Sequence, residues 1–308
     1  MTRGSPAAER LTDAEREVSQ RLSRGFAWPT ILLLAALISI ETAVIAAWAV
    51  GAMPLLVGML INSFASYGLY TVVHDSVHRS VSNRDPKYAM WDSMCGNVAA
   101  QLILLNFAGH RSSHLRHHAH TNTDRDPDLG AKGPLMALPV KWLISNVVLF
   151  LVAVPGGIHL GNALMRRLGA TKASEGGDSS LLADQRWAVR VGALAVLVSI
   201  PLGAVVPVVV LWIIPARLTF LYLAIFFAWL PHFPHEHTDR FRNTRITLFP
   251  GSTWLLLQQD RHLIHHLYPS IPWYRYRAAH RELASLLRER GAVVAGPSSD
   301  PRVRVRLR

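Results

Sequence analysis

The sequence predicts an all-α integral membrane protein, with about four transmembrane helices in two hairpins and a histidine-rich helical cap on the cytoplasmic side. Half of the residues are hydrophobic and only 17% are charged, two long segments carry almost no charge, and fifteen histidines gather beside those segments. A soluble domain of average composition carries about 25% charged residues. We therefore assign most of the 308 residues to one membrane domain, in which each span takes about 20 apolar residues.

Each predicted hairpin is a long apolar segment with a break near its middle. The first runs from Phe26 to about Val73 and turns near Gly51. The second runs from about Trp187 to Leu230 and contains prolines that bend or divide a helix. Both segments are long enough for two helices that cross a hydrocarbon core about 30 Å thick.

Two weaker apolar segments lie between the hairpins. The segment Ala89 to Phe107 holds polar side chains such as Asp92, so we expect an interfacial or partly buried helix. We expect Leu135 to Val154 to be re-entrant or interfacial, because the histidines before and after it can share one site only across an even number of spans. The expected domains are an arm over residues 1–25, a membrane domain over 26–290 and an Arg-rich tail over 291–308, with a Gly/Ser-rich loop from Gly157 to Asp184.

Thirteen of the fifteen histidines fall in four groups. His74 and His78 follow the first hairpin at a spacing of i, i+4, which places both on one helix face at the membrane boundary. The pattern H-x-x-H-H occurs twice, and each copy places three imidazoles on one side of a helix. The groups are His74 and His78; His110, His114, His117, His118 and His120; His232, His235 and His237; and His262, His265 and His266.

This histidine pattern indicates two metal ions. Imidazole binds Fe, Zn, Cu and Ni, and a conservative count of eight ligands exceeds the three or four that one zinc ion takes. The single cysteine, Cys95, excludes a Cys-ligated zinc site and an iron–sulfur cluster. A nitrogen-rich site beside the bilayer is suited to non-haem iron that uses O2 to attack a C–H bond in a lipid-like substrate.

The alternative is a non-enzymatic haem- or metal-binding membrane protein, such as a metal transporter. Tight H-x-x-H-H groups would crowd a porphyrin, which takes single histidines that face one another. A transporter would place its ligands inside its spans, together with carboxylates. The histidines instead flank the predicted spans.

The three histidine motifs resemble the boxes of the membrane fatty-acid desaturase and hydroxylase superfamily. They are His74-Asp-Ser-Val-His78, His114-Leu-Arg-His-His118 with the following Asp126-Pro-Asp128, and His262-Leu-Ile-His-His266 with the following Leu267-Tyr-Pro269. Within the superfamily, they are most similar to cyanobacterial-type β-carotene hydroxylases and bacterial fatty-acyl desaturases. The resemblance implies two iron ions, O2 as co-substrate, an external reductant and a long apolar substrate, carotenoid or fatty acyl chain, that is hydroxylated or desaturated.

The resemblance also implies the ligands, residue by residue. They are His74, His78, His114, His117, His118, His262, His265 and His266, with His232 in Leu230-Pro-His232 as the expected ninth and His235 as its alternative. His110 and His120 are expected behind the site or at the surface. Asp75, Asp126, Asp128 and Asp260 either orient ligand imidazoles, as outer carboxylates do, or are solvated loop residues.

Charge predicts the partners and the orientation. The net charge of +12 suits nucleic acid, anionic lipid or an acidic protein, and the apolar content favours the last two. The basic segments beside the boxes place the boxes and both termini in the cytoplasm, at a bacterial inner membrane. No dinucleotide-binding fingerprint is present, so we expect electrons from a docking carrier such as ferredoxin. The arginines that would bind this carrier or lipid headgroups are Arg275, Arg277, Arg281, Arg288 and Arg290.

Bulky aromatic side chains near the predicted spans are candidate limits of a substrate channel. Trp91, Phe107 and Trp254 are the residues considered. The alternative role for each is an anchor at the membrane interface, where aromatic side chains are enriched.

Overall fold

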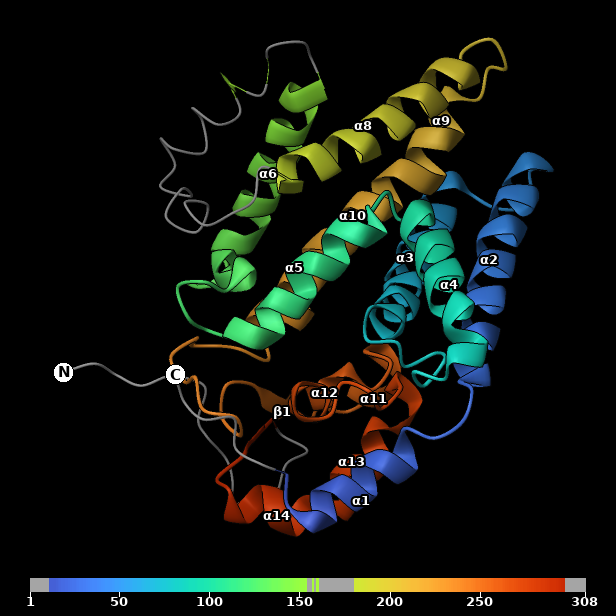
Figure 1. The fold of residues 1–308 in the computed structure, drawn as a ribbon. Helices are drawn as coiled ribbons and strands as arrows, with labels where there is room; N and C mark the ends of the chain where they lie inside the picture. The colour runs from blue at the N-terminus through green and yellow to red at the C-terminus, as the bar shows by residue number, and fades with distance from the viewer. Residues whose placement is uncertain (1–10, 154–156, 158, 161–179, 297–308) are drawn as a thin grey trace.

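The computed structural model describes residues 11–153, 157, 159–160 and 180–296, and the chain is mostly helical (Figure 1). The first predicted hairpin is confirmed as α2 (Trp28–Ala49) and α3 (Leu55–Val77). The turn between them uses Gly51 at φ +75°, a left-handed conformation that glycine adopts without strain. Helix α2 is apolar on all sides and faces outward, whereas 61% of the most apolar window of α3 is buried inside the protein. Helix α3 is therefore the central helix.

The second predicted hairpin is formed by α8 (Ser180–Ser199) and a return helix that is continuous over Val205–Trp229. The return helix consists of α9 (Val205–Val208), the π-helical η3 (Val209–Ile213), α10 (Ile214–Leu223) and the π-helical η4 (Ala224–Trp229). Pro215 has no N–H for the carbonyl of Leu211. Asn62 of α3 donates to that carbonyl instead (2.8 Å), so the proline also ties the two helices together.

Three helices in the described ranges are long and apolar enough to cross a membrane: α2, α3 and Val205–Trp229. Helix α8 is not among them, because Asp184, Arg186 and Arg190 lie in its first half. The fourth span therefore stays a prediction. Helix α8 also begins at Ser180, inside the stretch expected to be a loop, most of which lies outside the described residues.

The weaker apolar segments form shorter helices. The first gives α4 (Ala89–Leu102), which follows the turn η1 (Pro86–Tyr88) and reverses into α5 (Phe107–His120). The 14 residues of α4 rise about 21 Å, less than the hydrocarbon core. The second gives α6 (Ala137–Ala153), which packs along α8 and α10 rather than alone at an interface. Trp142 and Asn146 of α6 both hydrogen-bond to Arg217 of α10.

The C-terminal part of the chain packs below the ends of the long helices (Figure 1). Its elements are β1 (Arg245–Thr247), α11 (Ser252–Leu255), η5 (Gln259–Arg261), α12 (His262–Leu267), η6 (Trp273–Arg275), α13 (Tyr276–Glu282), α14 (Ala284–Glu289) and β2 (Val293–Ala295). The short helix η2 (Pro127–Ala131) lies earlier in the chain, between α5 and α6. Strand β2 pairs in parallel with β1, so the packed unit extends past residue 291 into the predicted tail, and the expected domain bounds stay a prediction. The short strand pair is also an exception to the predicted all-α class.

The N-terminal arm is not a separate appendage. Its helix α1 (Asp13–Leu22) begins with a capping box, in which Thr12 and Glu15 satisfy each other's backbone N–H groups. The helix packs on α13, and Leu22 joins the apolar cluster that contains Leu263 and Tyr276. The arm therefore belongs to the same packed unit as the third histidine motif.

The hairpin arrangement predicts which turns face away from the histidines. In a Cys95→Ala background, single cysteines at the exposed positions Ala52 and Leu202 should react with a membrane-impermeant thiol reagent outside intact cells. Cysteines at the exposed positions Arg125 and Arg288 should react only after the cells are opened. Labelling of Arg125→Cys and Leu202→Cys from the same side would contradict the two-hairpin topology.

Candidate metal centre

Four helical segments bring nine imidazoles together at one end of the long helices. His74 and His78 lie at the C-terminal end of α3, one turn apart on the face toward α5. The H-x-x-H-H pattern of α5 and that of α12 each turn three imidazoles toward the same space, and His232 follows the end of η4. Because helix periodicity puts residues i, i+3 and i+4 on one side, each motif contributes a row of donors.

The ligand atoms form three overlapping groups, in each of which they lie within 4.8 Å of one another. The first cluster is His74, His78, His114 and His265. The second cluster is His117, His232, His262 and His266. A third group, His118 with His265 and His266, joins the two. These are the nine residues predicted as ligands, including His232 as the ninth.

The ring nitrogens face one another at the spacing of donors around a cation. The Nε2 atoms of His265 and His118 are 2.8 Å apart, those of His118 and His114 3.2 Å, and those of His266 and His262 3.1 Å. Imidazole nitrogens bind a metal at about 2.1 Å, which sets neighbouring donors roughly 3.0–3.4 Å apart. The spacing therefore fits bound metal ions.

Burial keeps most of these imidazoles neutral, the form that binds metals. Desolvation, and then the neighbouring imidazoles, lower the pKa of His118, His262 and His266 well below the usual value. Among the described residues, both ring nitrogens of His232, Nδ1 of His262 and Nε2 of His78 are buried without a hydrogen-bond partner. Each such atom costs about 1–3 kcal/mol if nothing binds it. A nitrogen-only donor set with orphaned atoms fits the metal ions that imidazole binds, iron among them.

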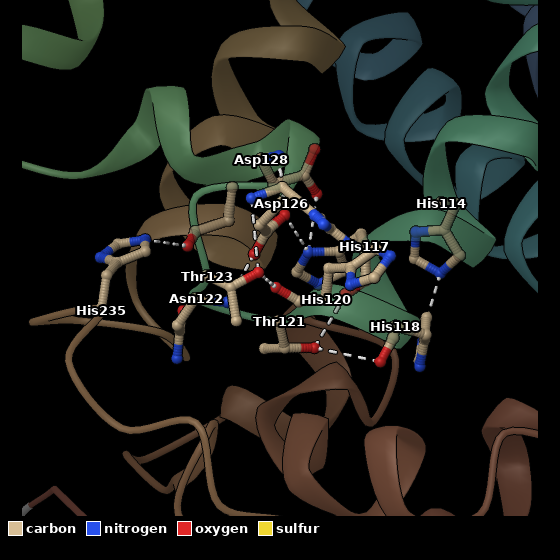
Figure 2. A network of polar contacts seen from close by, with 12 residues as sticks. His114, His117, His118, His120, Thr121, Asn122, Thr123, Asp126, Asp128 and His235 are labelled. Carbon is tan, nitrogen blue, oxygen red and sulfur yellow. Dashed lines mark hydrogen bonds and ion pairs between the residues drawn. The ribbon is translucent and has the colours of Figure 1, made fainter. Parts of the chain in front are cut away.

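Outer hydrogen bonds orient ligands of the second cluster (Figure 2). Nδ1 of His117 lies 2.8 Å from Oδ1 of Asp126 and 3.7 Å from Oδ2 of Asp128. Asp126 is itself fixed, because it caps η2 by accepting from the N–H of Asp128 and also accepts from the N–H of Asn122. Burial opposes a charge on His117, but the carboxylates of Asp128 and Asp126 outweigh burial and raise the pKa of His117. This contact is the one that the predicted orienting role of Asp126 requires, and the role itself stays a prediction.

Two hydroxyl groups near the ligands were missed by the sequence analysis. Tyr276 Oη lies 3.0 Å from Nδ1 of His265, and Thr121 Oγ1 lies 3.5 Å from Nδ1 of His266. Both hydroxyls lie behind their imidazoles and leave the Nε2 atoms facing the cluster. Tyr276 is eleven residues beyond His265, and no spacing rule relates such positions across two helices. Thr121 directly follows α5, and this position was the only feature of the sequence that could have indicated a contact of either hydroxyl with a histidine.

The orienting role considered for Asp75 and Asp260 is wrong. The carboxylate of Asp75 accepts from Thr30 Oγ1 (2.9 Å) and from the N–H of Trp273 (3.2 Å), so it ties α2 and η6 to α3. The carboxylate of Asp260 accepts from Ser252 Oγ (2.8 Å), Thr253 and Arg261. These carboxylates brace the elements around the centre and bind no imidazole.

The remaining histidines near the site lie behind the clusters. The ring of His235 stacks on His232 at 5.9 Å, and its Nε2 lies 3.2 Å from the carbonyl of Ala228. The ring of His110 stacks on His114 at 5.6 Å and lies 5.4 Å from the ring of Tyr70. His120 lies beyond the second box beside Thr123 (Figure 2). None of the three joins a ligand group within the described residues.

Apolar side chains border the clusters on the side of the long helices. The ring of Phe227 lies 5.9 Å from His74 and 5.8 Å from His262, and Tyr70 packs against it at 5.1 Å. Trp254 is 78% exposed, which suits the alternative role of an anchor at the membrane interface, whereas Phe107 is a core residue that packs on Gly96. Trp91 packs against Phe26 (5.6 Å).

Comparisons with known proteins match most of the chain. Residues 19–297 match a family model described as fatty acid desaturase. The chain is 29% identical to a beta-carotene ketolase of Paracoccus sp. (strain PC1), over 69% of this chain and 74% of the relative. It is also 29% identical to the dihydrorhizobitoxine desaturase of Bradyrhizobium elkanii, over 85% of this chain and 78% of the relative. A second Paracoccus beta-carotene ketolase, from strain N81106 / MBIC 01143, is 27% identical over 69% of this chain.

The position of His232 in the second cluster predicts different results for two neighbouring histidines. His232→Ala should lower the metal content of the purified protein from about two ions to about one per chain, because the second cluster loses a donor. His235→Ala is the matched control and should keep both ions, since its ring lies behind the cluster. Inductively coupled plasma mass spectrometry measures both values. Loss of metal from His235→Ala and not from His232→Ala would reverse the assignment.

Proposed function

This chain belongs to the fatty acid desaturase family, and we propose that it is a di-iron oxidoreductase that uses O2 to oxidise a C–H bond of a long apolar lipid substrate. The convergence of nine imidazoles, seven of them buried, beside apolar helices carries this proposal. The named relatives are a ketolase and a desaturase, which supports an oxidoreductase. Imidazole nitrogens 2.8–3.3 Å apart leave no room for a porphyrin. The groups of histidines gather at one end of the long helices, whereas a transporter would place its ligands along a span.

The residues of this chain hold the imidazole donors in place and form the apolar side of the site. Iron ions bound by the two clusters would supply the activation of O2 and the oxidation of the C–H bond. The hydrogen bonds of Asp126 to His117 and of Tyr276 to His265 hold donors in place from outside. Phe227 and Tyr70 exclude water from the side of the long helices and present an apolar wall to the substrate.

We propose a carotenoid as the first substrate to test, because two beta-carotene ketolases are among the relatives. A carotenoid or acyl chain would enter from the bilayer along α3 and η4, where the apolar wall meets the clusters. Desaturation is the second candidate reaction. The alignment with the desaturase covers 85% of this chain, more than the 69% covered by the ketolases.

We place the histidines and both termini on the cytoplasmic side of a bacterial inner membrane, where a small acidic carrier such as ferredoxin would deliver electrons. Arg277, Arg281 and Arg288 are exposed on α13 and α14 and form the proposed docking surface. Arg275 is not free for this role. Its guanidinium donates to the backbone carbonyls of Leu22 (2.7 Å) and Arg24 (2.8 Å), which holds the N-terminal arm.

Product analysis tests the reaction. Full-length protein in membranes, supplied with β-carotene, ferredoxin, its reductase and NADPH, should yield an oxygenated carotenoid by mass spectrometry. His265→Ala should lower the product at least about 100-fold, because His265 belongs to two ligand groups. The exposed His237→Ala is the control and should keep activity. If an acyl lipid loses two hydrogens and β-carotene is unchanged, the reaction is desaturation and not oxygenation of a carotenoid.

The docking surface predicts a salt-dependent electron delivery. The double charge reversal Arg277→Glu/Arg281→Glu should raise the apparent KM for ferredoxin about tenfold at low salt without changing metal content, because steering by opposite charges weakens. Lys87→Glu, an exposed reversal on η1, is the matched control. An unchanged KM together with weaker binding to anionic vesicles would assign these arginines to lipid headgroups.

A further inference from the structure

Glu15 is a buried carboxylate in the N-terminal arm, and it contacts two segments that carry metal ligands. Its side chain is fully buried. Oε1 accepts a hydrogen bond from the hydroxyl of Tyr268 (2.8 Å) and lies 2.9 Å from a guanidinium nitrogen of Arg240. The other oxygen, Oε2, accepts from the backbone N–H of Thr12 (2.9 Å), so the capping box sets the direction of the side chain.

The two partners of Glu15 lie close in sequence to ligands of the second cluster. Tyr268 is two residues beyond His266 and caps the end of α12. Arg240 lies in the loop that follows His232, and its guanidinium lies over the ring of Tyr268 at 5.8 Å. One carboxylate therefore links the segment after His232 to the segment after His266.

We propose that Glu15 is a positioning residue for the second cluster, which it supports by setting the distance between His232 and the imidazoles of α12. This inference rests on the proposed metal-binding function. Three of the four imidazoles of the first cluster lie on α3 and α5, so their positions do not depend on Glu15. The fourth, His265, is held by Tyr276.

The chemistry of the site fits a fixed link rather than a surface ion pair. Burial opposes the charged carboxylate, but the hydrogen bonds of Thr12 and Tyr268 and the charge of Arg240 together lower the pKa of Glu15. Breaking one partner of a buried ion pair leaves an uncompensated charge. The other contacts of the arm differ in kind, because Arg21 pairs with Glu282 at the surface and Leu22 packs in the apolar cluster that contains Leu263.

Metal titration distinguishes this role from general support of the fold. Metal-free full-length protein in detergent is titrated with Co2+, and binding is followed by the absorption of the bound ion and by calorimetry. Wild-type protein should bind two ions. Glu15→Gln and Tyr268→Phe should each weaken one site about tenfold and leave the other unchanged, and the double variant should be no weaker than the singles. Glu17→Gln, an exposed change on the same helix, is the control.

Each outcome decides the proposal. Equal weakening of both sites assigns Glu15 a general structural role and overturns the inference, as does unchanged affinity at both sites. If Glu15→Gln does not purify as a folded monodisperse protein, Tyr268→Phe carries the test, because it keeps the ring and removes only the hydroxyl. Wild-type protein that binds no second ion would contradict the proposed function itself, and the role of Glu15 would fall with it.

Discussion

The close approach of neutral, buried imidazole nitrogens is the constraint on which the rest of this structure depends. Pairs such as His265 and His118 face each other at 2.8 Å, and His232 has no hydrogen-bond partner at either ring nitrogen. A buried ring nitrogen such as those of His232 costs about 1–3 kcal/mol if nothing binds it. The helices that carry these histidines must therefore end close to one another, which explains why α3, η4 and α12 meet at the clusters.

The surrounding polar groups serve that requirement. The carboxylate of Asp126 and the hydroxyl of Tyr276 hold two ligands directly. The carboxylates of Asp75 and Glu15 act at longer range by tying α2, η6 and the N-terminal arm to the segments that carry ligands. Inside the apolar region the same principle operates on the backbone, since Asn62 binds the carbonyl that Pro215 leaves unpaired. The centre and the helices are thus parts of one hydrogen-bonded framework.

The sequence predicted the features that depend on local periodicity. The spacing of His74 to His78 and both H-x-x-H-H patterns place imidazoles on one helix face, and the resemblance supplied His232. Features that depend on contacts between distant segments were missed. The role of Tyr276, the bonds of Asp75 to Thr30 and Trp273, and the docking of the arm through Arg275 all join positions that no spacing rule relates. For Trp254 the sequence left two roles open, because the size of a side chain does not determine its exposure.

Anomalous diffraction at the iron absorption edge, from crystals of the full-length protein purified with iron, tests the central claim most directly. The account predicts two peaks. One should lie among His74, His78, His114 and His265, and the other among His117, His232, His262 and His266. A single peak, or density for a porphyrin between the boxes, would contradict the di-iron centre.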